Sequence, residues 1–355
     1  MIRFEPRSNP GAFLTYGVPV IAAAIAILLA AIPLALANAP ILKAYGLMIS
    51  GAFGSVFSIS EMLTRATPLI LTGLAAAIAF RAKLWNIGAE GQLYMGAMAA
   101  VAVGVGVIDG PSWIMIPIVM IAGALAGALM LIGPTLMKTR LGVDEVVTTL
   151  LLNFIVLLFV QMMLEGALKD PMSMGWPQSE PIIDSAAFPA LIERMRVHFG
   201  LVVALMCAIA LAVFVKRTVW GFEIRAVGEN AAAARFSGIS VTKTMILVAA
   251  LSGGLAGLAG VSEVAGTRGY LATDLSPGYG YAGIVVAMLA RLSPIGVIAS
   301  ALFVASVFVG ADSMSRAIGV SSYLADLIVA MALLCVLIGG FLTRFKVHFE
   351  RKTAG

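Results

Sequence analysis

The sequence predicts an all-helical, polytopic membrane protein with about ten transmembrane helices, some of them broken. Of its 355 residues, 61% are hydrophobic and 12% are charged, and the mean hydropathy is +1.04. A soluble domain carries roughly 25% charged residues. The apolar residues also gather in runs that approach the roughly 20 residues a helix needs to cross a bilayer. These observations favour one transmembrane domain over residues 1–355.

Ten apolar runs are candidate spans, and between them they cover most of the chain. They are residues 12–36, 60–80, 90–108, 113–136, 143–164, 199–216, 244–264, 281–291, 294–311 and 323–342. The run 281–291 is short and follows the Gly/Pro-rich segment Asp274–Gly280, so we expect half of a broken helix there. The first run is longer than the roughly 7–15 apolar residues of a signal peptide. We therefore expect a retained first helix.

Basic residues predict the orientation, because cytoplasmic loops are enriched in Lys and Arg. With the N-terminus inside, sixteen of the 23 basic residues fall on the cytoplasmic side and seven on the outer side. Both termini are therefore expected in the cytoplasm. The long outer segments are then Asn38–Ile59 and the proline-containing Gly166–Phe199. The second is expected to be an ordered loop, either a docking surface for an external partner or a connector.

A polar insert interrupts the apolar pattern at Arg81–Gln92, which reads R-A-K-L-W-N-I-G-A-E-G-Q. Bilayer hydrocarbon has no water to satisfy polar groups, so this insert must face protein or a water-filled cavity. Asn86, Glu90 and Gln92 are therefore candidates for a solute pathway. If a helix starts near Glu90, its N-terminal amides add donors and positive charge. The alternative is that Glu90 pairs with Arg81 or Lys83 and fixes the break.

A second polar constellation lies in Leu141–Asn153, which reads L-G-V-D-E-V-V-T-T-L-L-L-N. Asp144 and Glu145 are expected at the start of a span, where negative charge suits a helix N-terminus. Asn153 follows within the apolar run, where it lines the path or bonds a neighbouring helix.

The longest cytoplasmic loop, residues 216–243, is expected to couple the membrane domain to an ATPase. Asn230 is expected to cap a short helix over Ala231–Arg235, and Gly238 to end it. The coupling candidates are Arg225, Gly228, Glu229, Asn230, Arg235 and Gly238. The alternative is a solvated basic loop that anchors the membrane surface.

Three further patterns concern packing, symmetry and the outer surface. Small residues spaced four apart, such as Gly123 with Gly127 and Gly253 with Gly257, predict close helix packing. Each half of the chain has a Gly-interrupted segment near its start, which suggests an inverted repeat. Four residues are expected around the outer end of the span 244–264. We expect them to gate the external mouth of the solute pathway, to contact a solute-binding partner or to form a surface ion pair. They are Glu263, Arg268, Asp274 and Tyr279.

Motifs for catalysis and for cofactors are absent from the sequence. No Lys follows a Gly, so the phosphate-binding G-x-x-x-x-G-K-[ST] loop is missing and the chain is not an ATPase by itself. Gly278–Gly283 fits G-x-G-x-x-G but lacks the βαβ context that gives the pattern meaning. There is no H-E-x-x-H motif and no Cys/His cluster. We expect no catalytic residues, no metal, no cofactor and no nucleic-acid partner.

Three motifs carry a resemblance to a known family of membrane proteins. They are N-I-G-A-E-G-Q at 86–92, the Gly-acidic-Glu-Val opening at 141–146 and R-A-V-G-E-N at 225–230. The chain resembles the permease subunits of nucleoside-type, basic-membrane-protein-associated ABC importers, within the ribose and branched-chain amino acid permease superfamily. The resemblance implies import of nucleosides or related small polar solutes across the bacterial cytoplasmic (inner) membrane.

It also implies a second related permease, cytoplasmic ATP-binding subunits that supply the driving force, and an external solute-binding protein. A simple-sugar ABC permease is the first alternative. An ion-coupled secondary transporter is the second, with Glu90 as its best coupling residue.

Overall fold

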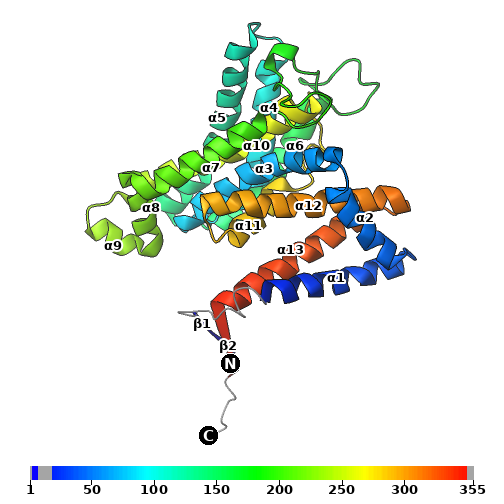
Figure 1. The fold of residues 1–355 in the computed structure, drawn as a ribbon. Helices are drawn as coiled ribbons and strands as arrows, with labels where there is room; N and C mark the ends of the chain where they lie inside the picture. Colours follow the sequence, from blue (N-terminus) through cyan, green and yellow to red (C-terminus); the bar gives the residue numbers. More distant parts are fainter. Residues whose placement is uncertain (1, 7–17, 350–355) are drawn as a thin grey trace. The chain divides into compact units, whose positions relative to one another are not determined.

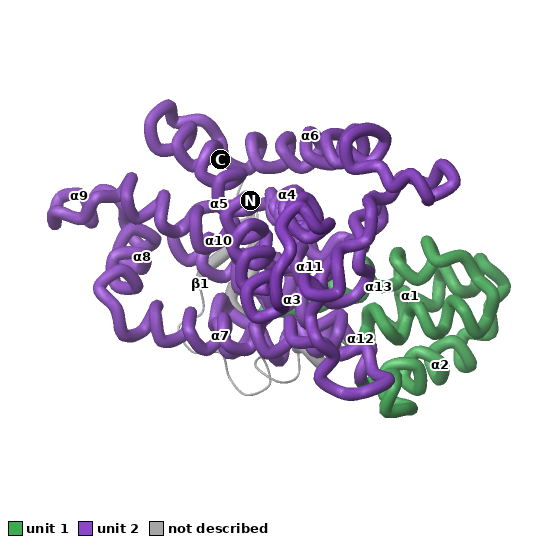
Figure 2. Tube along the Cα trace, turned by 90° about the horizontal axis from the view of Figure 1, so that it is seen from above, with its two compact units in different colours: residues 1–59, 306–355 green, residues 60–305 purple. Residues whose placement is uncertain are grey.

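The computed structural model describes residues 2–6 and 18–349, and this part of the chain is almost entirely helical (Figure 1). Seven of the described helices are long and apolar enough to cross a membrane, or eight if a bent pair counts as one span. The prediction of an all-helical polytopic membrane protein is thereby confirmed. The chain divides into two compact units, residues 1–59 with 306–355 and residues 60–305 (Figure 2).

The first unit joins the beginning and the end of the chain. It contains β1 (Ile2–Pro6), α1 (Val18–Leu36), α2 (Ile41–Phe53), the end of α12 (Pro294–Ile318), α13 (Ser322–Arg344) and β2 (Phe345–Phe349). The helical segments Ala24–Leu36 and Ile41–Phe53 meet at a bend of 119°. The segment 38–59, expected as an outer loop, thus contains a helix. The expected start of the first span, residues 12–17, lies outside the described residues.

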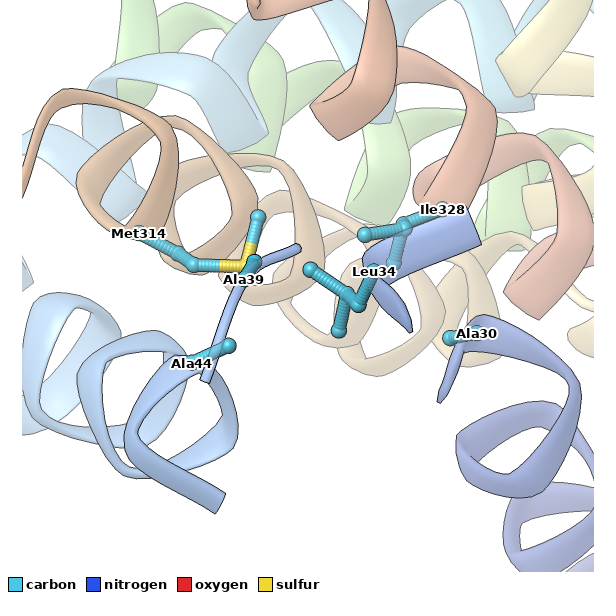
Figure 3. Packing of buried hydrophobic residues seen from close by; sticks show 6 residues of the cluster. All are labelled: Ala30, Leu34, Ala39, Ala44, Met314 and Ile328. Atoms are coloured by element: carbon cyan, nitrogen blue, oxygen red, sulfur yellow. The ribbon is translucent and has the colours of Figure 1, made fainter. Parts of the chain in front are cut away.

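A small apolar cluster holds this first unit together (Figure 3). Leu34 of α1 and Met314 of α12 are fully buried, and they pack with four further residues around the turn into α2. These are Ala30, Ala39, Ala44 and Ile328. The apolar ends of α1, α12 and α13 therefore make one local core.

The strands β1 and β2 pair in antiparallel register, with Arg3 opposite His348. The segments that precede α1 and follow α13 therefore lie side by side. This pairing fits the expectation that the chain enters and leaves on one side of the membrane.

The second unit contains the helices that frame the polar insert. They are α3 (Val56–Arg81, from residue 60), α4 (Ala89–Gly104), α5 (Ser112–Leu141), α6 (Glu145–Glu165), α7 (Gly200–Arg217), α8 (Val219–Glu229), α9 (Ala231–Phe236), α10 (Val241–Glu263) and α11 (Tyr279–Leu289). The helix α10 continues as a π-helix, η3 (Val264–Arg268), and the loop 166–199 holds one 3-10 turn, η2 (Asp184–Ala186). With 11 residues and about 1.5 Å of rise each, α11 is too short to cross a bilayer, as expected for half of a broken helix.

Glycines let α10 lie against α4 and α5 at backbone distance. A Cβ at Gly96 would overlap the backbone of Gly257, and a Cβ at Gly127 would lie 2.9 Å from the Gly257 Cα. A Cβ at Gly260 would lie 2.7 Å from the Ala97 amide nitrogen. The close packing predicted from the small-residue spacing is confirmed. The helix α10 therefore packs directly against α4 and α5.

Candidate functional site

The polar insert forms a buried break between α3 and α4. The helix α3 ends at Arg81 and α4 begins at Ala89, so the expected helix start near Glu90 is confirmed. The side chains of Asn86, Glu90 and Gln92 are 0%, 4% and 1% exposed. These three side chains therefore face the protein interior, as the cost of polar groups in lipid requires, whereas Lys83 and Trp85 of the insert are exposed.

Asn86 and Gln92 pair their amide groups across the break. Asn86 Nδ2 donates to Gln92 Oε1 at 2.9 Å, and Gln92 Nε2 donates to Asn86 Oδ1 at 2.8 Å. Asn86 Nδ2 also donates to Ser252 Oγ of α10 at 3.0 Å, and Asn86 Oδ1 accepts from the Gly88 amide at 3.0 Å. The two side chains close the turn and tie it to α10.

Asn153 of α6 connects the break to two other helices. Its Oδ1 accepts from the Gly91 amide at 2.9 Å, and its Nδ2 donates to the Ile87 carbonyl at 2.9 Å. The same Nδ2 donates to the hydroxyl of Tyr281 on α11 at 3.1 Å. These contacts match the expectation that Asn153 bonds neighbouring elements. They also place it beside the other candidate pathway residues.

Glu90 joins the first turns of two helices. Its Oε2 accepts a hydrogen bond from the amide of Gly280 at 2.6 Å, and Gly280 lies in the first turn of α11. A Cβ at Gly280 would overlap the Glu90 amide nitrogen. The Glu90 carboxyl group thus lies beside two helix N-termini, whose partial positive charge favours the ionised form.

The suggested pairing of Glu90 with Arg81 or Lys83 is wrong. Arg81 Nη2 donates to the Leu292 carbonyl at 2.6 Å, and Lys83 Nζ donates to the Glu229 carbonyl at 3.2 Å. Glu90 instead bonds the Gly280 amide, so the break is fixed by backbone contacts of these three side chains and not by an ion pair between them.

Hydroxyl groups from distant segments complete the site. Thr149 Oγ1 accepts from the Ile87 amide at 3.3 Å, and Thr72 Oγ1 donates to the Tyr279 carbonyl at 3.0 Å. Tyr94 donates its hydroxyl to the Thr273 carbonyl at 2.7 Å. Sequence reasoning missed these residues, together with Ser252 and Tyr281. The one available signal was a hydroxyl side chain inside an apolar run. Because such side chains recur throughout the chain, this signal could not distinguish the residues of the site.

An ion pair supports the same break from the loop side. Lys138 Nζ contacts Glu145 Oε1 and donates to the Lys83 carbonyl at 2.9 Å. Glu145 Oε1 also accepts from the Trp85 amide at 3.2 Å. Asp144 caps α6 by accepting from the Val146 amide at 2.8 Å. The helix-end assignment is confirmed for Asp144, and Glu145 additionally braces the turn.

The loop 216–243 folds into α8 and α9, which meet at Asn230. Asn230 Oδ1 accepts from the Ala232 and Ala233 amides at 3.0 and 3.1 Å, which confirms the predicted cap. The helix α9 ends at Phe236, and Gly238 follows with φ +85°, a conformation that favours glycine.

The end of α8 packs against the turn that follows α3. A Cβ at Gly228 would overlap the Arg81 carbonyl oxygen, and Lys83 bonds the Glu229 carbonyl. The guanidinium of Arg225 donates to the Val215 carbonyl of α7. Arg235 lies on the exposed part of α9. The loop thus contacts the residues that lead into the polar break.

The outer cluster separates into a surface pair and buried groups. Arg268 Nη1 contacts Asp274 Oδ1 at 3.0 Å, and Arg268 Nη2 donates to the Asp274 carbonyl at 2.8 Å. The ion-pair interpretation holds for these two residues. Glu263 and Tyr279, in contrast, are 4% exposed. No group of three potential metal ligands occurs in residues 2–6 and 18–349.

A helical membrane bundle with polar breaks in two helices is the architecture of a solute permease. The family described as "Branched-chain amino acid transport system / permease component" matches residues 58–337, so the chain belongs to this permease family. It is thus a multi-pass membrane protein and the permease component of a transport system.

Curated relatives cover nearly the whole chain. The glucose ABC transporter permease TsgB13 of Haloferax volcanii is 35% identical over 99% of this chain and 95% of its own length. The guanosine ABC transporter permease NupP of Bacillus subtilis is 35% identical over 90% of this chain and 92% of its own. The nucleoside ABC transporter permease NupB of Lactococcus lactis is 36% identical over 84% of each chain. The chain is therefore an ABC transporter permease with nucleoside and sugar permeases among its relatives.

Proposed function

We propose that this chain is the membrane subunit of an ABC importer for nucleosides or related small polar solutes. ATP hydrolysis on separate subunits drives the uptake. The observation that carries the proposal is the hydrogen bond from the Gly280 amide to the Glu90 carboxylate. This bond joins the broken segment α3–α4 to the broken segment α10–α11. Two interrupted helices that share one polar contact form an element that can open and close around a solute.

The solute pathway in this proposal runs past Asn86, Glu90, Gln92 and Asn153. In the structure their amide and carboxylate groups bond one another and the backbone. A nucleoside or sugar presents the same kinds of donors and acceptors. In the outward- or inward-open state, these groups would exchange their mutual hydrogen bonds for bonds to solute. Such an exchange requires the two breaks to separate, which links solute binding to the conformational equilibrium.

In this proposal the ATPase subunit binds α8 and α9. Several large apolar side chains of these helices are exposed, an arrangement that favours a protein partner. They are Val219, Trp220, Phe222 and Phe236. Movement of the loop reaches the pathway through Gly228 and Glu229, which contact the turn at Arg81 and Lys83. The coupling set is completed by Arg225, Asn230, Arg235 and Gly238.

The remaining partners are those that the permease family implies. A second related permease completes the membrane pathway, and an external solute-binding protein delivers solute to the side of the loop 166–199. We place the chain in a bacterial cytoplasmic membrane with both termini in the cytoplasm. The sixteen-to-seven basic split supports this orientation, and the pairing of β1 with β2 supports a location of both ends on the same side.

Glucose or another simple sugar is the second candidate solute. The permease TsgB13, named for glucose, is 35% identical over 99% of this chain. Guanosine and nucleoside permeases match at 35% and 36% identity, and the 86–92 and 225–230 motifs favour nucleosides. Ion-coupled secondary transport is disfavoured because Glu90 is held by a backbone amide between two helix starts.

The experiment is uptake by the complete complex in proteoliposomes, with external binding protein and internal ATP. Radiolabelled guanosine and glucose are offered separately. Vanadate should abolish uptake of guanosine, and an ionophore that collapses ion gradients should leave it unchanged. Uptake of glucose alone would replace the nucleoside assignment with the sugar assignment. Uptake that needs an ion gradient and no ATP would overturn the proposal.

A further inference from the structure

The helix α2 (Ile41–Phe53) carries an apolar stripe that is exposed in the structure. Its residues Leu42, Ile49 and Phe53 are 88%, 67% and 57% exposed. Their spacing of seven and four residues places them on one face of the helix. Val56, at the start of α3, is 69% exposed and follows the stripe. Large apolar side chains gathered on one face mark a contact surface.

The opposite face of α2 is occupied by the end of α12. A Cβ at Gly51 would overlap the Ser313 side chain, and a Cβ at Gly310 would lie 2.6 Å from the Met48 carbonyl oxygen. Ala44 of α2 is fully buried. Because the two helices meet at backbone distance, α2 cannot rotate to bury its stripe without losing this packing. The stripe therefore needs a partner outside these two helices.

The direction of α2 decides what surrounds the stripe. The bend between the segments of α1 and α2 is 119°, more than a right angle, so α2 runs partly back along α1 (Figure 1). The Tyr45 hydroxyl of α2 donates to the carbonyl of Ile27, and Ile27 is the central residue of α1 (Val18–Leu36). The helix α2 therefore lies alongside α1 rather than projecting beyond its end.

At this depth the surroundings of the stripe are the bilayer. With 19 uncharged residues and about 1.5 Å of rise each, α1 has roughly the length of the hydrocarbon core. Its Leu28, next to Ile27, is 70% exposed, as a side chain that faces lipid would be. The bond of Tyr45 to Ile27 brings the surface of α2 next to this one. With 13 residues, α2 is itself too short to cross the bilayer.

The charge of α2 fits a position within one leaflet. Its one charged residue, Lys43, lies in the first turn, next to the connection from α1. The long side chain of a lysine lets its ammonium group reach the headgroups while the stem lies along apolar surface. The residues from Tyr45 to Phe53 carry no charge, so the rest of the helix can lie in hydrocarbon.

We infer that α2 is a re-entrant helix in the leaflet where α1 ends, with Leu42, Ile49 and Phe53 against lipid acyl chains. The segment 38–59 is then a lipid-contact surface and not a water-exposed loop that an external partner could bind. The inference uses the membrane location of the chain and not the identity of its solute. A helix of the second permease is the rival occupant of the stripe.

The test is nitroxide accessibility in the assembled transporter, held in nanodiscs of phosphatidylethanolamine and phosphatidylglycerol. The background lacks Cys207 and Cys335, the two cysteines of the chain. Labels are attached singly in Leu42→Cys, Ile49→Cys and Phe53→Cys. Collisions are measured with oxygen, which concentrates in hydrocarbon, and with a nickel chelate, which stays in water. Leu28→Cys is the lipid reference, and Met174→Cys, at a fully exposed residue of the loop 166–199, is the water reference.

The ratio of oxygen to nickel collisions at all three stripe positions should exceed the ratio at position 174 severalfold and approach the ratio at position 28. It should increase from position 42 to position 53, because α2 turns back into the bilayer. Nickel access equal to that at position 174 would place α2 in water and overturn the inference. Exclusion of both reagents in the complex, with oxygen access in the isolated permease, would assign the stripe to the second permease instead.

The result is separable from the proposed function, because the collision ratios do not depend on uptake. A transporter that carries no nucleoside would overturn the proposed solute and leave these ratios unaffected. The three substitutions replace exposed side chains, so assembly should persist. If one variant does not assemble, the other two still decide between lipid, water and protein.

Discussion

Glu90 and Gly280 are 190 positions apart in the sequence, yet the Glu90 carboxylate accepts the Gly280 amide at 2.6 Å. Each residue lies in the first turn of its helix, α4 or α11. The contact therefore joins the two breaks of the membrane domain. Because it spans both breaks, this hydrogen bond is suited to act as a latch between α4 and α11.

We predict that Gly280→Ala disrupts this latch. The added Cβ would overlap the Glu90 amide nitrogen, and overpacking in a close-packed site costs about 1–3 kcal/mol. Thermal stability of the purified permease and uptake per inserted molecule should both fall. Gly133→Ala is the matched control, since a Cβ there has no neighbour within 4 Å. Equal behaviour of the two variants would show that α4 and α11 do not pack this closely.

The Asn86–Gln92 pair distinguishes a pathway role from a bracing role. Asn86→Ala and Gln92→Ala each remove two reciprocal hydrogen bonds. If these groups bind solute, uptake of some nucleosides should fall more than uptake of others, with protein still assembled. Uptake of several nucleosides, normalised to inserted protein, measures this. A uniform loss that tracks protein yield would leave bracing as their role.

Coupling to the ATPase should depend on the junction of α8 and α9. Gly228→Ala places a Cβ on the Arg81 carbonyl, and Glu229→Arg reverses a charge beside the carbonyl that Lys83 binds. Both should leave membrane insertion and ATP hydrolysis measurable while reducing uptake per ATP. Ala232→Ser, on the exposed face of α9, is the control. Normal transport by Glu229→Arg would argue against this docking surface.

The ion pair of Lys138 and Glu145 should contribute to the stability of the break. Glu145→Gln removes the charge that faces Lys138 and weakens the bond to the Trp85 amide. A partly buried cation would lose its partner, at a cost of about 1–3 kcal/mol. Asp144→Asn keeps the helix cap and should leave the melting temperature unchanged. The prediction fails if the two variants have the same melting temperature.

Topology provides a further test. Arg3 and His348 lie opposite each other in the β1–β2 pairing, so cysteines at the two positions should share one side of the membrane. In sealed cells neither should react with an impermeant reagent, and both should react after permeabilisation. Met174→Cys, on the loop 166–199, should react from outside. External labelling at position 348 would reverse or break the proposed orientation.

Local features could be predicted from the sequence, and long-range contacts could not. The caps at Asp144 and Asn230 depend on neighbouring residues, and burial of the polar insert follows from its apolar flanks. The alternative that Glu90 pairs with Arg81 or Lys83 was wrong, because those side chains bond backbone carbonyls elsewhere. The Glu90 carboxylate instead bonds Gly280, which is 190 positions away. The bonds of Asn153 to Tyr281 and of Asn86 to Ser252 join hydroxyls that no local pattern distinguishes.

The secondary structure of the segment 38–59 was also missed. Its apolar residues are interrupted by Lys43 and by glycines, so they form no run of the length of a span. Ala39 and Ala44 nevertheless pack beside Leu34 and Met314, and α2 forms there. Tertiary packing decided the conformation there. The chemistry of the solute likewise depends on which groups meet in space, which a single sequence does not specify.

The central claim is tested most directly by uptake of radiolabelled guanosine into proteoliposomes that contain the complete complex. The account predicts guanosine accumulation that requires ATP, is abolished by vanadate, and persists when an ionophore removes every ion gradient. Guanosine uptake that continues without ATP and collapses with the ionophore would contradict it.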